Sequence, residues 1–279
     1  MSLLKSFKNS PKWSIKWNNF FDIYENIFQK FKGKKITFVE VGVGDGGSLF
    51  MWKKFFGKKA KIIGIELNPE AKKLKKFGFE IHIGDQTDKN FWKNFYKKVG
   101  KIDILLDDGG HKNIQTITTL MGSINHINNN GLIVVEDTQS NYIKKAFKNP
   151  SKYSFINFCS HIIENIHRKN PSLKKKINDF SKNISSIQFF NSVIVFYIDT
   201  KNRNYSKLIE NNRRLRNFYI DFRHDAYFLR SLEVFAKFFG KIKSESFLYK
   251  VIRKLFHRNI FFSINEKLEI KKYIKILKK

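Results

Sequence analysis

The fold is decided by the stretch KIDILLDDGGHKN at residues 101–113, which is followed by GLIVVEDTQ at residues 131–139. Each part contains a short apolar run, Ile102–Leu106 and Leu132–Val135, that is closed by turn-forming or acidic residues. Such runs predict strands that are buried on both faces, as in a parallel sheet. The residues between them carry apolar side chains at helical spacing, so the unit is predicted to be strand–helix–strand.

Four carboxylates and one imidazole follow these two strands. A right-handed crossover makes the strands parallel, so their carboxyl ends lie at the same edge of the sheet, where open α/β sheets bind ligands. Adjacent strands lie about 4.8 Å apart, and anions that close repel one another unless a cation or proton intervenes. A hard divalent cation such as Mg²⁺ explains the cluster most simply. The cluster consists of Asp107, Asp108, His111, Glu136 and Asp137.

Composition indicates a folded protein of 279 residues, with 42% apolar and 16% aromatic residues, that holds one sizeable core and an appendage. The single cysteine, Cys159, excludes an intramolecular disulfide and fits a reducing cytoplasm. The opening residues MSLLKSFKNSPKW lack the apolar core of a signal peptide, and no uncharged apolar run is long enough to span a bilayer. We therefore expect a cytoplasmic protein.

The formal net charge of +30 is extreme. It would suit nucleic acid, an anionic membrane surface or a phosphorylated substrate. A lysine-rich composition with many lysines on solvated helix faces explains it equally well. The charge therefore bears on partners and solubility and leaves the fold open.

A glycine-rich turn follows the first predicted strand, Ile36–Val41. The turn reads GVGDGGS at residues 42–48 and leads into a helix over residues 49–56. Strand, glycine turn and helix together are typical of a nucleotide-binding site, because glycines let the backbone approach a ligand closely. Glu40 lies near the end of that strand, where we expect a carboxylate to order the loop or to hold a cationic ligand group.

Two further strands end in polar residues that fit a nucleoside. The second strand, residues 61–67, contains Glu66 about twenty residues after the glycine turn, a position that suits a bidentate bond to ribose hydroxyls. The third strand, residues 80–83, is followed by Asp85 and Gln86, which lie where an adenine edge would be read. A plain turn is the alternative interpretation of these last two residues.

The two ends of the chain differ from its centre. Residues 1–35 predict a helical lead-in, and residues 184–190 and 192–200 predict two antiparallel strands that complete the sheet. Residues 201–279 predict a helical basic extension, which could be a membrane-surface element, a lid or an oligomer contact. The predicted fold class is therefore α/β, with a Rossmann-like, seven-stranded, mostly parallel sheet, an antiparallel last strand and a helical C-terminal extension. The expected domain lies at residues 36–200.

Five motifs in order carry a family resemblance. They are EVGVGDGGS at residues 40–48, GIELNP at 64–69, GDQTD at 84–88, LDDGGH at 106–111 and VEDT at 135–138. Together they resemble class I S-adenosylmethionine-dependent methyltransferases. The nearest branch is that of the metal-dependent sugar O-methyltransferases of macrolide-sugar tailoring and capsule heptose methylation. The resemblance covers roughly residues 34–200, and the tail lies outside it.

The resemblance implies a role for each motif residue. The S-adenosylmethionine contacts would be Glu40, Gly42, Gly44, Ser48, Glu66, Asp85, Gln86 and Asp107. Asp108, Glu136 and Asp137 resemble the Mg²⁺ ligands, and His111, together with Asp108, would act in catalysis, His111 as the general base. The family usually has serine where Gly110 stands, a departure that would loosen the turn presenting His111.

The expected reaction is transfer of a methyl group to a sugar hydroxyl that Mg²⁺ acidifies and positions. The sugar would be nucleotide-linked, such as a heptose for bacterial surface polysaccharide. An RNA-binding or RNA-modifying methyltransferase is the alternative, although no base-stacking signature is present and the basic residues do not form one stripe. An iron hydroxylase is the last alternative, since it would need two histidines and one carboxylate, and only His111 lies near the acids.

Overall fold

The computed structural model describes residues 2–143, 153–170, 179–201, 209 and 264–277. The chain divides into two compact units, Met1–Ile209 and Glu210–Lys279. The first unit carries all of the predicted site residues. In the second unit the structure describes one helix, α10 (Ile264–Leu277).

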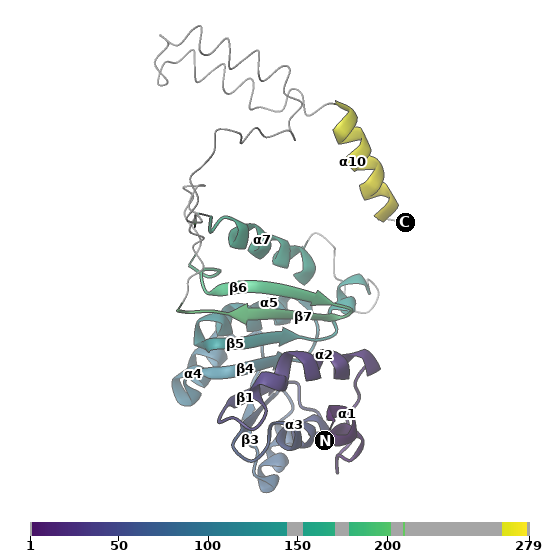
Figure 1. The fold of residues 1–279 in the computed structure, drawn as a ribbon. Coiled ribbons are helices and arrows are strands. Elements are labelled where there is room, and N and C mark those ends of the chain that lie inside the picture. Colours follow the sequence, from purple (N-terminus) through teal and green to yellow (C-terminus); the bar gives the residue numbers. More distant parts are fainter. Residues whose placement is uncertain (1, 144–152, 171–178, 202–208, 210–263, 278–279) are drawn as a thin grey trace. The chain divides into compact units, whose positions relative to one another are not determined.

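A seven-stranded sheet forms the centre of the first unit, in the order β3-β2-β1-β4-β5-β7-β6 (Figure 1). Its strands pair in parallel from β3 to β5, and β7 runs antiparallel to both β5 and β6. The predicted fold class is therefore confirmed. The strands are β1 (Thr37–Val41), β2 (Lys61–Glu66), β3 (Glu80–Ile83), β4 (Ile102–Asp107), β5 (Ile127–Val135), β6 (Ile184–Phe190) and β7 (Val193–Ile198).

Helices cover both faces of the sheet because successive strand residues point to opposite sides. Phe38 packs in the cluster formed with α2 (Asn18–Phe28) and α3 (Gly47–Phe56), whereas Val39 packs in the opposite cluster. That second cluster also takes side chains from α4 (Lys89–Val99), α5 (Asn113–Ser123) and α7 (Phe155–His167). Figure 1 shows α2 on one side of the sheet and α5 on the other.

The strand order reverses at β1, with β2 on one side of it and β4 on the other. Open α/β sheets bind their ligands at such a switch point, outside the carboxyl ends of the strands. The predicted site residues lie at or after the carboxyl ends of β1 to β5, the parallel strands that end at this edge. The remaining short helices are η1 (Gln29–Phe31), η2 (Pro69–Phe77), η3 (Ile124–His126) and η4 (Thr138–Tyr142).

The N-terminal lead-in is two helices and not the single helix expected over residues 1–35. The first, α1 (Leu3–Lys8), is separated from α2 by residues 9–17, which form no helix or strand. Pro11 explains the break, since proline lacks a backbone N–H and disfavours helix in the residue before it. The sheet also departs from expectation in β5, which begins at Ile127, five residues before the predicted start.

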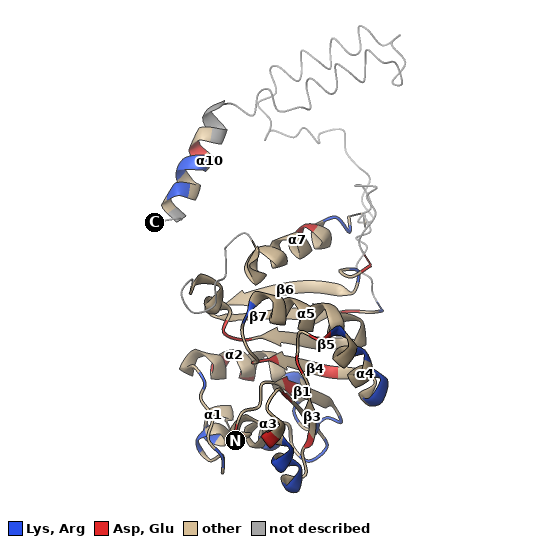
Figure 2. Cartoon of the chain, turned by 180° about the vertical axis from the view of Figure 1, so that it is seen from behind, with Lys and Arg blue, Asp and Glu red and all other residues tan. Residues whose placement is uncertain are grey.

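The C-terminal extension is helical where the structure describes it, in α10. The other residues of the predicted extension, apart from 201 and 209, lie outside the described residues. Figure 2 shows lysine and arginine on elements as separate in sequence as α4 and α10. Among the described residues, no helix is both long and apolar enough to cross a membrane.

Candidate active site

Three loops meet at the switch point, and backbone hydrogen bonds fix their spacing. The N–H of Gly42, after β1, donates to the carbonyl of Ile65 at 2.9 Å. The N–H of Asp108, after β4, donates to Val41 at 3.0 Å, and the N–H of Glu136, after β5, donates to Asp107 at 3.0 Å. The sheet ladder therefore continues one residue past each strand, which places the first residue of each loop at the same edge.

Gly42 is required by a close backbone approach. Its φ is +81°, and a Cβ built there would lie 2.0 Å from the carbonyl oxygen of Asp108. No other residue fits this position without moving the loop after β4. Gly44, also at positive φ, has nothing within 4 Å of an added Cβ, so the turn leaves open space beside it. The glycine turn, which is the loop after β1, therefore packs against the loop after β4 and borders a cavity.

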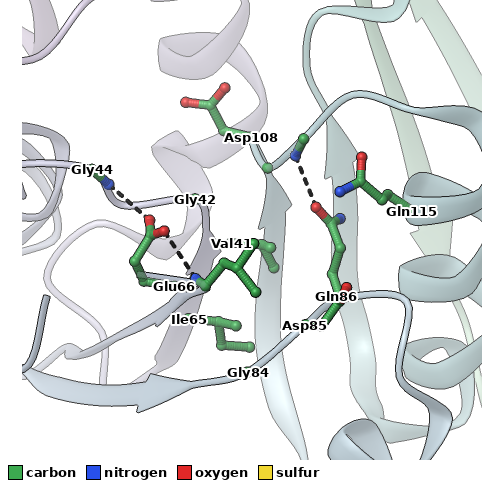
Figure 3. A pocket seen from close by; sticks show the side chains of 13 residues that line it. Val41, Gly42, Gly44, Ile65, Glu66, Gly84, Asp85, Gln86, Asp108 and Gln115 are labelled. Atoms are coloured by element: carbon green, nitrogen blue, oxygen red, sulfur yellow. Dashed lines mark hydrogen bonds between the residues drawn. The ribbon is translucent and has the colours of Figure 1, made fainter. Parts of the chain in front are cut away.

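That cavity has a volume of about 360 Å³ and lies between the glycine turn and the loops after β2, β3 and β4 (Figure 3). Five of the eight predicted cofactor residues line it, namely Gly42, Gly44, Glu66, Asp85 and Gln86. Three predicted residues do not line it, namely Glu40, Ser48 and Asp107. The predicted metal ligand Asp108 lines it as well.

Glu66 binds the backbone of two turns beside the cavity, those after β1 and β2. One carboxylate oxygen accepts the N–H groups of Val43 and Gly44, both at 3.0 Å. The other accepts the N–H groups of Leu67 and Asn68 at 2.9 and 3.0 Å. Glutamate is long enough to reach back across the turn, so this side chain fixes the shape of the predicted ribose subsite (Figure 3).

Gln86 joins the opposite wall to the loop after β4. Its amide nitrogen donates to Asp107 and to Thr119, both at 3.0 Å, and its oxygen accepts the N–H of Gly110 at 2.8 Å. Asp107 is buried, and burial raises the pKa of its carboxyl group, which the bonds from Gln86 and Gly109 oppose. Asp85 instead accepts the N–H and hydroxyl of Thr87 within the turn after β3.

Glu40 and Ser48 form a buried pair behind the cavity. The Ser48 hydroxyl donates to Glu40 at 2.7 Å, and the indole of Trp52 donates to its other oxygen at 3.2 Å. Burial raises the pKa of Glu40 to about 7, against the opposing attraction of the Lys16 ammonium 3.7 Å away. Glu40 thus orders the loop, which is one of the two roles expected for it. The direct cofactor contacts predicted for Glu40 and Ser48 stay predictions.

The predicted metal and catalytic residues meet at the tips of β4 and β5. Asp108, His111 and Asp137 each offer one ligand atom within 4.8 Å of the others. The imidazole Nε2 lies 3.9 Å from Asp108 Oδ1 and 3.5 Å from Asp137 Oδ2. His111 therefore lies among the possible ligand atoms, and its predicted role as general base stays a prediction.

Two of these residues have strained backbones. His111 and Asp137 have φ values of 56° and 52°, in the left-handed region that residues other than glycine rarely adopt. Such conformations are concentrated at functional sites because surrounding structure must hold them in place. The strain turns both side chains toward the same point between the two loops.

Glu136 is held by Lys16 and Tyr24. Both of its oxygens accept from the Lys16 ammonium, at 2.9 and 2.8 Å, and the Tyr24 hydroxyl donates to it as well. The carboxylate is buried, and burial together with the charge of Asp108 raises its pKa, while Lys16 and Tyr24 oppose that shift. The structure thus groups Asp108 and Asp137 with His111 and binds both Glu136 and Asp108 to Lys16. The ligand assignments stay predictions.

Lys16 is the site residue that the sequence analysis missed. Its side chain is 1% exposed and its ammonium bonds Asp108 as well as Glu136, with Glu40 nearby. Burial alone would lower its pKa, but the three carboxylates outweigh that effect and raise it above its ordinary value. No local signal marks this lysine among 54 basic residues. Its role depends on Asp108 and Glu136, which lie 92 and 120 residues further along the chain.

The donor set fits a divalent cation. Two aspartates supply oxygen ligands of the kind that Mg²⁺, Mn²⁺ and related ions accept, and the imidazole of His111 lies beside them. Asp108 also lines the cavity, so an ion held there would adjoin a molecule bound in it. An iron site with two histidines does not fit, since the cluster found among the described residues contains only His111.

Comparison with solved structures supports the predicted α/β methyltransferase fold. The chain superposes on a methyltransferase from the mycinamycin pathway, MycE, solved with Mg and SAH. The TM-score is 0.61 at 23% sequence identity, over 71% of this chain and 52% of that one.

Two of the curated relatives are named as sugar O-methyltransferases, the class that the motifs predicted. A tetracenomycin-C rhamnosyl 2'-O-methyltransferase of Streptomyces olivaceus is 29% identical over 170 residues, which is 57% of this chain and 43% of the relative. The mycinamicin VI 2''-O-methyltransferase of Micromonospora griseorubida is 30% identical over 150 residues, 51% and 37% of the two chains. The chain thus matches less than half the length of these relatives. No protein-family model matches it.

Proposed function

We propose that this protein is an S-adenosylmethionine-dependent O-methyltransferase that uses a divalent cation, taken to be Mg²⁺, to methylate a sugar hydroxyl. The observation that carries the proposal is the meeting of a glycine-walled cavity with the Asp108–His111–Asp137 cluster, since Asp108 belongs to both. A methyl donor in the cavity would face an acceptor held at the cluster. The curated relatives, which are named for sugar hydroxyls, support the acceptor class.

Residues of the cavity suit the cofactor in chemical detail. The apolar side chains of Val41 and Ile65 form its floor and the polar side chains of Glu66 and Gln86 form its walls. A carboxylate beside a glycine turn at the end of the second strand is the usual acceptor for ribose hydroxyls in such folds. S-adenosylmethionine supplies an activated methyl group when bound, so the protein has only to orient it.

The acceptor hydroxyl needs to lose a proton. A divalent cation lowers the pKa of a hydroxyl group whose oxygen is bound to it. His111 lies 3.5 Å from Asp137 and is the base at hand, since an imidazole nitrogen can accept a proton. Asp108 and Asp137 would hold the cation beside His111, the proton acceptor, and near the cofactor cavity that Asp108 lines. Alignment of the two reactants then provides much of the rate enhancement, as in other group transfers.

The finer assignment of the acceptor is a nucleotide-linked sugar, such as a heptose destined for bacterial surface polysaccharide. The basic surface supports it, because a diphosphate-bearing acceptor would be attracted to a chain with a net charge of +30. A glycosylated small molecule is the alternative acceptor, as the names of the curated relatives indicate.

The test is a methyl-transfer assay with labelled S-adenosylmethionine and a panel of nucleotide sugars and glycosides, each with Mg²⁺ or with EDTA. We expect label in at least one sugar, lost with EDTA and restored by Mg²⁺. Transfer that is insensitive to EDTA would contradict the metal role. Label in RNA with no label in any sugar would instead favour the RNA-modifying alternative, and a steep salt dependence would accompany it.

A further inference from the structure

The N-terminal strap, which we define as Ser10–Trp17, reaches each of the three predicted metal ligands. Lys16 bonds Asp108 and Glu136, and the indole N–H of Trp17 donates to Asp137 at 2.8 Å. One short segment between α1 and α2 therefore occupies oxygens on every carboxylate of the predicted set. Nothing in the sequence motifs or in the names of the relatives assigns a role to it.

The Lys16 ammonium lies where a cation between β4 and β5 would lie. It is within hydrogen-bond distance of both oxygens of Glu136 and bonds Asp108 across from them. A divalent ion that took both carboxylates as ligands would need the same lone pairs. It would also lie beside a buried ammonium, and like charges in a poorly solvated site repel strongly. The two cations therefore exclude one another from this set of ligands.

The strap is held in a way that permits release. Its backbone forms no helix or strand, and its large side chains Trp13 and Trp17 are 68% and 58% exposed. Its anchor lies at the other end, where the Ser10 hydroxyl donates to the carbonyl of Gly47 at 2.8 Å. A segment with little buried apolar surface opens at low cost, so its C-terminal half is held by the ion pairs of Lys16 and the hydrogen bond from Trp17 to Asp137.

The strap also borders the cofactor side of the site. Lys12 and Trp13 line a second cavity of about 520 Å³ together with Gly44 and Glu66, which also line the cofactor cavity. A Cβ added to Gly47 would lie 2.4 Å from the carbonyl oxygens of Lys12 and Trp13, so this part of the strap packs tightly on the start of α3. Release at Lys16 would leave that packing intact.

We propose that Lys16 is a built-in competitor of the divalent cation: strap and metal are alternative occupants of the Asp108–Glu136–Asp137 cluster, and metal binding releases Lys16 to solvent. This inference rests on the metal site of the proposed function. In the closed form the ammonium neutralises the buried acids and keeps them paired. In the metal-bound form Glu136 becomes a ligand with the two aspartates. The apparent metal affinity equals the intrinsic affinity multiplied by the fraction of molecules in which the strap is open.

Lysine footprinting by mass spectrometry tests the exchange directly on the full-length protein. An acetylating reagent is applied in EDTA and at Mg²⁺ concentrations that saturate binding in calorimetry. We expect Lys16 to react at least about tenfold more slowly than exposed Lys12 in EDTA. The two rates should converge in Mg²⁺, with Lys12 as the internal control. Continued protection of Lys16 at saturating Mg²⁺ would overturn the proposal.

A pair of variants measures the competition without any activity assay. Lys16→Met keeps the length of the side chain and removes its charge, so the Mg²⁺ dissociation constant should fall by about tenfold or more. Lys12→Met, in the same strap but exposed, should leave it unchanged. An unchanged or weaker affinity in folded Lys16→Met overturns the proposal, as does failure of Mg²⁺ to bind any form. If Lys16→Met does not fold, the footprint of the wild-type protein decides.

The outcomes separate this inference from the proposed function. Release of Lys16 by Mg²⁺ with no methyl transfer to any acceptor would support the strap and contradict the methyltransferase proposal. Mg²⁺-dependent methyl transfer with Lys16 still protected would support the methyltransferase proposal and contradict the exchange of Lys16 for the metal.

Discussion

The two halves of the site edge are built differently. On the cofactor side, which comprises the loops after β1, β2 and β3, the carboxylates that line the cavity accept hydrogen bonds from backbone N–H groups. Glu66, for example, bonds Val43, Gly44 and its own next two residues. On the metal side, the loops after β4 and β5, the carboxylate of Glu136 is held by Lys16 from 120 residues away. The first half is set by local geometry and the second by long-range charge.

This difference has a functional consequence. Backbone N–H groups cannot leave, so the cofactor side keeps its shape and leaves a cavity of about 360 Å³ between its walls. A lysine on an irregular strap can leave, so the metal side can exchange one cation for another. We therefore expect substitutions on the two sides to separate cofactor affinity from metal affinity.

The largest separation is expected from Asp137→Asn. Removing one charge from the cluster should lower methyl transfer at least about a hundredfold, because loss of a ligand exceeds the 10- to 100-fold effects of outer-sphere changes. The affinity for S-adenosylhomocysteine in calorimetry should stay within about twofold of the wild type. Asp179→Ala, an exposed aspartate paired with Lys182, is the control. Loss of cofactor affinity in Asp137→Asn would show that the cofactor side and the metal side of the site do not act independently.

Glu66→Gln is expected to have the opposite effect, which is a loss of cofactor affinity without a loss of metal affinity. The amide keeps the shape of the side chain but cannot accept from backbone donors at both of its ends. The affinity for S-adenosylhomocysteine should fall about tenfold or more, since hydrogen bonds to a charged group contribute about 1.5–3 kcal/mol each. Mg²⁺ affinity, measured separately, should not change. A loss of Mg²⁺ affinity of the same size would show that the two halves are coupled.

These contrasts also explain what the sequence could predict. The motifs of the cofactor side are contiguous, and Gly42 and Glu66 line the cavity as expected because their positions depend on a single strand and turn. Strands such as residues 80–83 and 184–190 have the predicted bounds, since β-branched runs closed by turn residues define them locally. β5 was predicted short because Asn128–Asn130 look like a turn, although Asn128 pairs with Asp103.

Lys16 shows the limit of such prediction. A lysine in a polar segment usually lies on the surface, and its burial here depends on acids that only the folded sheet brings near. The break at Pro11 was the available signal that residues 9–17 leave the helix, and a single lead-in helix was predicted in spite of it. Glu40 was predicted to order the loop or to hold a cationic ligand group, and the structure shows that it binds Ser48 and Trp52.

A smaller effect is expected from Tyr24→Phe. The variant removes the hydroxyl that donates to buried Glu136 and leaves that lone pair unsatisfied. The free energy of unfolding in EDTA should fall by about 1–3 kcal/mol, measured by denaturant titration. Tyr197→Phe removes a comparable but exposed hydroxyl, which donates to Gln188, and should change stability by less than about 0.5 kcal/mol. Equal effects in the two variants would argue against a buried, paired Glu136.

The smallest effect is expected at Cys159, which belongs to neither half. Burial raises the pKa of its thiol to about 12, so at pH 8 the thiol is protonated. A disulfide reagent should therefore fail to react with the folded protein at that pH. The thiol should react fully after denaturation. Rapid labelling of the native protein at pH 8 would contradict the burial of α7 against the sheet.

The central claim is that a divalent cation binds between the tips of β4 and β5, beside the cofactor cavity. Its most direct test is the anomalous diffraction of crystals grown with Mn²⁺ and S-adenosylhomocysteine. The account predicts one strong metal peak bonded to carboxylate oxygens of Asp108 and Asp137, with the nucleoside bound between Glu66 and Gln86. A structure in which the nucleoside is bound but Lys16 still fills the cluster and no peak lies there would contradict it.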